Sequence, residues 1–354
     1  MDLSDRLAVS YYKTVLPINE HHKVYLVRHQ ETGRLCVKKI LDIYSANVYR
    51  NLQRHPVEGI PRIIASCEED GRLTVIEEFI SGITLRDKIE ITRKAVSVPE
   101  GIPPDPASSA ASAALPEGPA SDGSASDGSA SDGPASDDSA SDLLTIPEIG
   151  LYMIRLCGIL ERLHSLDPPV IHRDIKPSNI MISGSRSVYL LDLNAARQYS
   201  GSPSQEADTR LLGTHGYAAP EQYGFRESSP QTDIYSVGRT LKEAVGALPC
   251  EDHTFDVVIA KCTQMDPSKR YASAGDLKAA IVKCLKRYLR KRPPKDPDSY
   301  GRIPDDCLDI LRLAPLRAGT NRFVRTLGAV LIMAAVSAVL VLTALLIEEF
   351  VFVP

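Results

Sequence analysis

Along the first part of the chain, hydrophobic and polar residues follow the short period of β-strands. From Tyr11 to Phe79, runs rich in branched and aromatic residues are separated by turn-forming sequences such as ETG and EDG. The five runs are YYKTV, VYLVRH, RLCVKKI, RIIASC and LTVIEEF. Between the third and the fourth, residues 43–53 (IYSANVYRNLQ) have the pattern of a helix. These patterns predict a small lobe of five strands and one helix.

After residue 142 the hydrophobic residues take the spacing of helices. One helical face carries Ile149, Met153, Leu156, Leu160 and Leu163, and Pro147 fits the first turn of that helix. Further helices are predicted at 232–246, 254–263 and 274–291. We therefore expect an α+β fold, with a β-rich lobe and its connection at 11–95 and a helical lobe at 143–292.

The segment between the two predicted lobes, residues 96–142, has a different composition. It repeats a five-residue ASDGS-like unit, and from Pro103 to Asp142 it carries acidic residues and no base. Such a sequence buries too little apolar surface to offset its chain entropy, so we predict a disordered insertion. A long loop adds closure cost only slowly, so the fold tolerates it. A docking or phosphoacceptor role for its serines stays open.

Near the other end, residues 326–347 contain no charged side chain. As a helix this stretch would span roughly 33 Å, enough for the hydrocarbon core of a bilayer. The alternative is a buried core helix, which is usually shorter and keeps a polar stripe. We predict a single transmembrane helix, preceded by a juxtamembrane spacer at 293–325 and followed by a short external tail at 348–354. Arginines before the span and two glutamates after it place the lobes in the cytoplasm.

Charge and cysteine content add little to the prediction of fold and function. The formal net charge is −4, and we expect no nucleic-acid partner. The seven cysteines form no CxxC pair, which favours small buried side chains in a reducing compartment over a metal site or disulfides. The N-terminus lacks the charge and apolar pattern of a cleaved signal peptide.

The most specific motif is IHRDIKPSNIMI at 171–182, followed by LLDLN at 190–194. His-Arg-Asp, with Lys two places and Asn five places after the Asp, resembles the catalytic loop of eukaryotic-type (Hanks-type) protein kinases. The IKPSN form is similar to the serine/threonine branch, and the motif style is similar to that of bacterial members. The resemblance covers roughly residues 11–290. It implies a bilobal kinase fold that transfers the γ-phosphoryl group of ATP to Ser or Thr hydroxyls of proteins.

The resemblance also implies roles for the loop residues. Asp174 would orient the attacking hydroxyl and accept its proton, and Lys176 would stabilise the transferring phosphoryl group. Asn179 and Asp192 would supply oxygen ligands for Mg²⁺ or Mn²⁺. Arg173 would contact a phosphorylated residue of the activation segment.

Other landmarks of the family follow in order. Lys38 in CVKKI would be the nucleotide lysine, with Lys39 as its solvent-facing neighbour. Glu77 stands in the gatekeeper position, and the backbone from Glu78 to Ile80 would bind the adenine edge.

In GTHGYAAPEQ and the sequences beyond it, further positions match the family. Thr214 would contact Asp174, Glu221 would pair with Arg270, and Asp233 would brace the catalytic loop. We predict that Thr209 is the phosphorylated residue, since it lies between Asp192 and Glu221.

Three departures bear on activity. The turn near Pro17, Asn19 and His22 lacks the glycines of a phosphate-covering loop, although His21 to Lys23 could attract phosphate. The helix at 43–53 lacks the glutamate that pairs with the lysine, and Asn47 is its nearest counterpart. DLN replaces DFG, and Asn194, with Asn19, could adopt the left-handed backbone that glycine would supply.

These departures leave two functions open. One is a membrane-tethered kinase whose partners are Mg-ATP, protein substrates and, through its C-terminal helix, membrane lipids, with self-association for autophosphorylation. The other is a pseudokinase that acts as a membrane-bound interaction scaffold.

Overall fold

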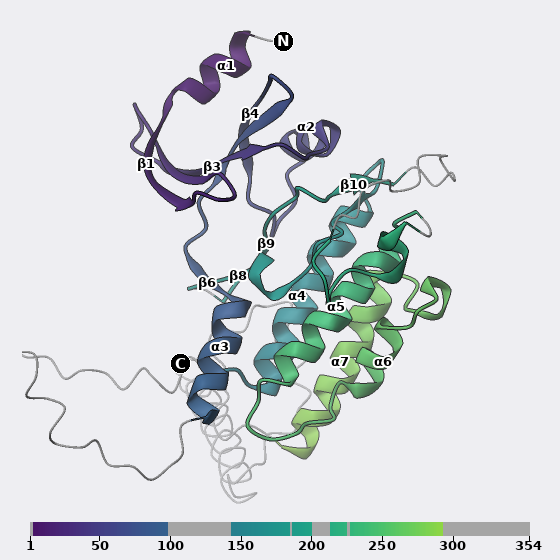
Figure 1. Cartoon of the computed structure of the whole chain (residues 1–354). Helices are drawn as coiled ribbons and strands as arrows, with labels where there is room; N and C mark the ends of the chain where they lie inside the picture. Colours follow the sequence, from purple (N-terminus) through teal and green to yellow (C-terminus); the bar gives the residue numbers. More distant parts are fainter. Residues whose placement is uncertain (1–2, 98–142, 185, 200–212, 225–226, 293–354) are drawn as a thin grey trace, which may run out of the picture. The chain divides into compact units, whose positions relative to one another are not determined.

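The structure, a computed structural model, describes residues 3–97, 143–184, 186–199, 213–224 and 227–292. The chain divides into two compact units, Met1–Leu285 and Lys286–Pro354. Apart from residues 286–292, the fold described below belongs to the first unit. It consists of a β-rich lobe and a helical lobe, as the sequence predicted (Figure 1).

The β-rich lobe is built on a five-stranded antiparallel sheet with the order β1-β2-β3-β5-β4. Its strands are β1 (Tyr12–Asn19), β2 (Val24–His29), β3 (Leu35–Leu41), β4 (Ile63–Glu69) and β5 (Arg72–Glu78). All five coincide with the predicted runs. Because side chains alternate along a strand, each strand presents one set of residues to each face of the sheet.

One face of this sheet is covered by a helix that the sequence did not predict, α1 (Leu3–Ser10). Cys36 and Ile76 are fully buried on that face, and Ala8 and Val9 of α1 pack against their cluster. The helix is short and its apolar residues are few, so its packing against the sheet rather than its own periodicity accounts for it.

The helix after β3, α2 (Ala46–Arg54), begins three residues later than predicted. It buries Val48, Tyr49 and Leu52, and Leu52 shares a helical face with the other two because it follows them by four and three residues. Asn47 lies on the exposed side. The helix thus turns an aromatic residue, and not Asn47, toward the interior.

The boundary between the lobes lies earlier than the predicted residue 95. Strand β6 (Gly82–Thr84) pairs with β8 (Ile180–Ser183) of the helical lobe. The helix that follows it, α3 (Leu85–Ser97), carries Arg86, whose guanidinium lies 2.7 Å from the carboxylate of Glu243 on α5. Residues 82–97 therefore belong with the helical lobe.

The centre of the helical lobe is α4 (Ile146–His164). The side chain of Thr145 caps its first turn by accepting a hydrogen bond from Glu148 N, and Pro147 lies in that turn. The five residues of the predicted face are all fully buried. Leu151, Ile154 and Ile159 are buried as well, so α4 is enclosed on more than one side.

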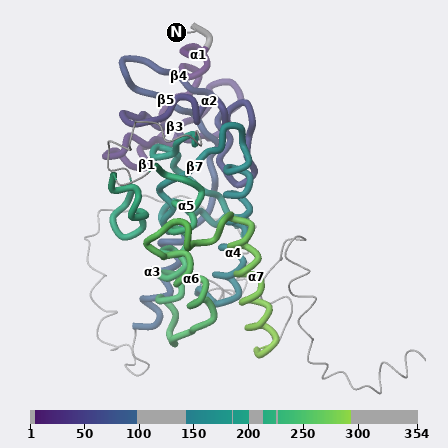
Figure 2. The backbone as a smooth tube through the Cα atoms, turned by 90° about the vertical axis from the view of Figure 1, so that its right-hand side faces the viewer, coloured from purple at the N-terminus to yellow at the C-terminus, as the bar shows by residue number. Residues whose placement is uncertain are grey.

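The other elements of this lobe surround α4, and α3 to α6 lie together in both views (Figures 1 and 2). Its remaining helices are α5 (Pro230–Val245), α6 (Asp256–Cys262) and α7 (Ala274–Lys291). Single-turn helices occur at Pro177–Asn179, Pro220–Tyr223 and Pro267–Lys269. Short strands are β7 (Val170–Ile171), β9 (Val188–Leu190) and β10 (Arg197–Gln198).

Several predictions fall outside the described residues. These are the insertion from residue 98 to 142, the spacer at 293–325, the predicted span at 326–347 and the tail at 348–354. Within the part of the chain that the structure describes, no helix is both long and apolar enough to cross a membrane.

Two helical glycines provide a matched test of the packing. A Cβ at Gly238 of α5 would lie 2.4 Å from Cys262 Cβ, whereas a Cβ at Gly158 of α4 would meet only the ends of Arg162 and Lys278, at 3.7 Å or more. We expect Gly238→Ala to lower the free energy of unfolding by about 1–3 kcal/mol through overpacking. Gly158→Ala should raise it by up to about 1 kcal/mol through helix propensity. Urea unfolding measures both, and equal effects would contradict the packing of α5 on α6.

Candidate active site

One buried carboxylate holds the backbone of the predicted catalytic loop. Asp233, near the start of α5, is fully buried, and its Oδ2 and Oδ1 accept hydrogen bonds from the backbone N–H groups of His172 (2.9 Å) and Arg173 (2.8 Å). His164, the last residue of α4, places its Nε2 2.9 Å from the same carboxylate. Asp233 thus ties α4, α5 and the loop together.

These contacts set the charge of Asp233. Burial, the largest single effect, raises its pKa, but the hydrogen bond and charge of His164, the charge of His172 and the N–H of Arg173 together hold the pKa below its usual value. The carboxylate is therefore ionised at neutral pH. The loop it holds includes a strained residue, since Arg173 has φ 69°.

Asp174 lies at the centre of a compact polar cluster. Its Oδ2 accepts a hydrogen bond from Lys176 Nζ at 2.7 Å, and its Oδ1 accepts one from Thr214 Oγ1 at 2.8 Å. Lys176 Nζ also donates to Thr214 Oγ1 at 2.7 Å. Burial raises the pKa of Asp174, but Lys176, Thr214 and the charge of His172 outweigh it, so the pKa is lowered. An ionised Asp174 is a hydrogen-bond acceptor and a base.

Asn179 and Asp192 lie beside this cluster. Asn179 Nδ2 donates to the backbone oxygen (2.9 Å) and Oδ2 (3.1 Å) of Asp174, which leaves its carbonyl oxygen as the atom that can bind a cation. The segment of Asp192 is attached to the loop because Leu191 N donates to Asn179 O at 2.7 Å. The donor set of one carboxylate and one amide oxygen fits a hard cation such as Mg²⁺.

The left-handed backbone conformation that the sequence predicted for Asn194 occurs instead two residues earlier, at Asp192. Asp192 itself has φ 65°, and neither Asn194 nor Asn19 is among the residues with positive φ. Asn194 instead donates its backbone N–H to Asp192 Oδ1 at 3.3 Å. The prediction that Asn194 and Asn19 replace glycine by adopting this conformation is therefore wrong.

The assignment of the two lysines of β3 is reversed. Lys39, predicted to face solvent, is 8% exposed, and its Nζ lies 2.6 Å from Glu77 Oε1. Lys38 lies on the opposite sheet face, the one that Cys36 shares, because neighbouring strand residues alternate. Lys39, and not Lys38, is thus the lysine on the inner side of the lobe.

Burial lowers the pKa of Lys39 as the largest effect, yet the charge of Glu77, the charge of Asp192 and the hydrogen bond that Lys39 donates to Glu77 together raise it. Lys39 therefore carries a positive charge, and it lies within the electrostatic reach of Asp192.

The predicted adenine-binding segment follows β5. Glu78 is the last residue of that strand, and its N–H donates to Arg62 O at 2.9 Å. That donor is engaged within the protein. Ile80 is half-buried in the connection to β6. The amides of Phe79 and Ile80, which follow the last residue of β5, are the other donors of this segment.

The glycine-free turn of residues 20–23 closes the β1–β2 hairpin with side-chain and backbone bonds. His22 N donates to Asn19 Oδ1 at 3.1 Å, Lys23 has φ 53°, and Lys23 Nζ pairs with Asp42 at 2.6 Å. Below this turn lies a cavity of about 350 Å³. Its lining includes His21, His22, Lys23, Asp174, Asn194, Gly213 and Thr214. The turn and the Asp174 cluster therefore face a common space.

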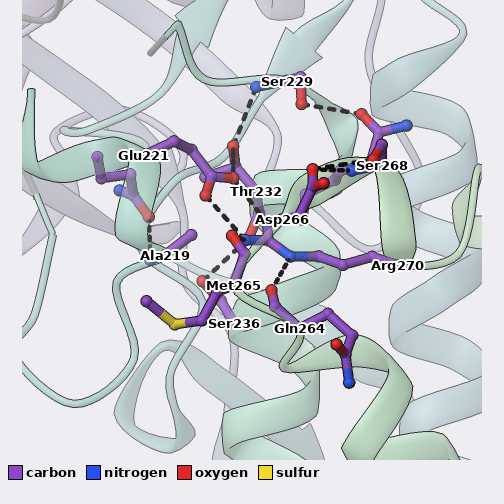
Figure 3. A network of polar contacts seen from close by, with 12 residues as sticks. Ala219, Glu221, Ser229, Thr232, Ser236, Gln264, Met265, Asp266, Ser268 and Arg270 are labelled. Carbon is purple, nitrogen blue, oxygen red and sulfur yellow. Dashed lines mark hydrogen bonds and ion pairs between the residues drawn. The ribbon is translucent and has the colours of Figure 1, made fainter. Parts of the chain in front are cut away.

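A second buried ion pair supports the segment beyond Thr214. Arg270 makes a bidentate pair with Glu221, with Nη1–Oε1 at 2.7 Å and Nη2–Oε2 at 2.9 Å, and both side chains are buried (Figure 3). The hydroxyl of Thr232 on α5 donates to Glu221 Oε1 at 2.9 Å, and Arg270 Nε donates to Gln264 O at 2.8 Å. Figure 3 shows these residues converging from three elements.

The comparisons with known proteins agree with this geometry. Residues 135–296 match the family described as protein kinase domain. The chain is 27% identical over 166 residues to serine/threonine-protein kinase PknB of Mycobacterium leprae, covering 39% of this chain and 26% of that protein. It is 30% identical over 165 residues to the probable serine/threonine-protein kinase PknB of Corynebacterium glutamicum, covering 46% and 25%.

Among solved structures, the kinase domain of PknI from Mycobacterium tuberculosis is similar at 16% identity with a TM-score of 0.47, covering 78% of this chain and 96% of that one. The chain spans about a quarter of the length of the two curated relatives. Over the matched residues, the chain is similar to a protein kinase domain and to these two bacterial serine/threonine-protein kinases.

Some site residues escaped the sequence analysis, and one predicted residue is not described. Thr209 lies outside the described residues, so its phosphorylation stays a prediction. The inward position of Lys39, its pairing with Glu77, and the contact of His164 with Asp233 were missed. For His164 a signal existed, because its place at the end of a long helix just before the catalytic loop brings it near that loop.

Because the carboxylate of Asp233 is buried and bonded, the free energy of unfolding should differ between the original chain and Asp233→Asn by an amount that depends on pH. We expect Asp233→Asn to lower the free energy of unfolding at pH 7 by about 3 kcal/mol, since an amide cannot accept from both N–H groups. The folded-state pKa is below the unfolded one, so this contribution exists above about pH 3.9 and is lost as the pH falls through the folded value.

Urea unfolding of both chains from pH 7 to pH 3.5 measures this difference. It should be constant at neutral pH and should shrink at the acidic end. The control is Asp70→Asn, in the exposed turn between β4 and β5, whose difference from the original chain should be small at every pH. A difference for Asp233→Asn that grows toward acid would contradict the role given to this carboxylate.

Proposed function

We propose that this chain is a protein serine/threonine kinase that transfers the γ-phosphoryl group of Mg-ATP to Ser or Thr hydroxyls of proteins. The observation that carries the proposal is the cluster of Asp174, Lys176, Asn179 and Thr214 beside Asp192, all within one hydrogen-bonded region. A matching protein kinase domain and similar bacterial serine/threonine kinases support it.

Each residue then has a distinct task. The ionised Asp174 orients the acceptor hydroxyl and takes its proton, while the ammonium of Lys176, 2.7 Å away, stabilises negative charge next to it. The oxygens of Asn179 and Asp192 would hold Mg²⁺, with Mn²⁺ as a substitute. The bound metal nucleotide supplies the phosphoryl group and neutralises its charge.

A pseudokinase scaffold is the second candidate function. The observations that favour it are the glycine-free turn of residues 20–23, the nearby Pro17 of β1, which lacks an N–H, and the absence of an acidic residue from α2. In that case the site would hold nucleotide poorly or would not turn it over.

One kinetic experiment separates the two functions. In a radiolabelled phosphate-transfer assay, we expect Asp174→Asn to reduce kcat by about 10²–10⁴-fold, because it removes the general base. Asp256→Asn, on an exposed helix end, is the matched control and should retain full activity. Turnover that is absent from the original chain, or that is unchanged in Asp174→Asn, would favour the scaffold function.

We further propose that residues 326–347 anchor the kinase to the inner face of the cell membrane, where lipids surround the helix and self-association allows autophosphorylation. The uncharged stretch and the arginines before it support this orientation. Deleting residues 326–354 should move the protein from the membrane fraction to the supernatant of lysed cells. Deleting 98–142 instead should leave it in the membrane fraction, and an original chain found in the supernatant would refute the anchor.

A further inference from the structure

Glu77 occupies an unusual place in the site. It lies on β5 directly before the predicted adenine-binding segment, yet it is only 6% exposed and its carboxylate contacts Lys39 Nζ at 2.6 Å. In the ladder, Val37 pairs with Glu77 and Lys39 pairs with Val75, so Lys39 and Glu77 are diagonal neighbours on one face of the sheet. Both ends of the ion pair therefore belong to hydrogen-bonded neighbouring strands.

The helix that could offer a competing carboxylate has none. The sequence of α2, ANVYRNLQR, contains no Asp or Glu, and Asn47 is exposed. Tyr49, one of the three buried residues of α2, is 1% exposed and donates its hydroxyl to Asn194 Oδ1 at 3.1 Å. Burial first, and then the charges of Glu77 and Asp192, raise the pKa of Tyr49, so it stays a neutral donor. Thus the hydrogen bond of Tyr49 joins α2 to the segment of Asp192.

We infer that Glu77 is the positioning residue that orients Lys39 toward the phosphates of the nucleotide, in place of a helix carboxylate. The inference rests on the proposed function in that it assumes a nucleotide in this cleft, although it does not need turnover. Lys39 is buried, charged and within electrostatic reach of Asp192, the predicted metal ligand. An ammonium in that place can reach bound phosphate while Glu77 fixes its direction.

A pair within the sheet behaves differently from a pair between sheet and helix. The strands β3 and β5 are joined by their backbone ladder from Cys36–Glu78 to Leu41–Leu73. A shift of α2 would leave both partners of the pair in place. It would instead move Tyr49 and through it Asn194, two residues from Asp192. In this chain the position of Lys39 thus does not depend on α2. Any control by α2 acts on the segment of Asp192, the predicted metal ligand.

The test compares a nucleotide with its phosphate-free nucleoside. Binding of Mg-ADP and of adenosine to the full chain is measured by calorimetry for the original protein and for Glu77→Gln. We expect Glu77→Gln to weaken ADP binding by about 10-fold or more, as for loss of a charge-assisted bond. Adenosine affinity should stay within about twofold, because its binding does not involve Lys39.

Two further variants make the result decisive. Glu77→Asp keeps the charge beside Lys39, and therefore the fold, but withdraws the carboxylate by one methylene group; it should weaken ADP binding several-fold and leave adenosine binding unchanged. Asn47→Ala, on the exposed side of α2, should change neither affinity. This control also tests whether the helix contributes to the lysine site.

The outcomes separate this inference from the kinase proposal. Equal loss of ADP and adenosine affinity in Glu77→Gln and Glu77→Asp would show that Glu77 only shapes the pocket, and unchanged ADP affinity in both would show that it does not position Lys39. Either result overturns the inference and leaves Asp174-dependent turnover as it was. Selective loss of ADP binding in a chain without turnover would support the inference and refute the kinase proposal. An original chain that binds neither ligand would refute both.

Discussion

The buried carboxylate of Asp233 is the interaction on which the site depends. It satisfies two backbone N–H groups of the catalytic loop and binds the histidine at the end of α4. These bonds help to hold Arg173 in a left-handed conformation, which costs about 1–3 kcal/mol for a residue with a Cβ. The packed helices α4 and α5 therefore determine where Asp174 points, although they contribute no atom to the cluster around it.

The β-rich lobe positions Lys39 in a different way. In place of contacts between separate elements, it uses two strands of a single sheet, with Lys39 and Glu77 as diagonal neighbours. Breaking a buried pair of this kind is costly because it leaves one charge unpaired. The lysine is therefore held within the sheet, whereas α2 is joined to the Asp192 segment by a hydrogen bond from Tyr49 to Asn194. The hydrogen bond between Tyr49 and Asn194 is weaker than the buried ion pair of Lys39 with Glu77.

Sequence reasoning predicted the helical-lobe part of the site well, since its residues are close along the chain. Asp174, Lys176 and Asn179 lie within six positions, so the loop geometry brings them together wherever the loop is placed. It failed at β3, where Lys38 and Lys39 are adjacent and point to opposite faces. Both faces of this sheet carry buried apolar residues, so alternation along RLCVKKI does not show which face adjoins the cleft. The unpredicted helix α1 covers one of them.

What the sequence determined by itself is the five strands of the sheet, the helices α2 and α4 to α7 and the local order of the catalytic loop, because periodicity and short spacings are properties of neighbouring residues. The tertiary structure decided which lysine faces inward, which carboxylate pairs with it, and that residues 82–97 join the helical lobe. These outcomes follow from contacts between residues far apart in the chain, such as Lys39 with Glu77 and Arg86 with Glu243. Burial favours these ion pairs, because a charge that is removed from water is costly unless it is paired.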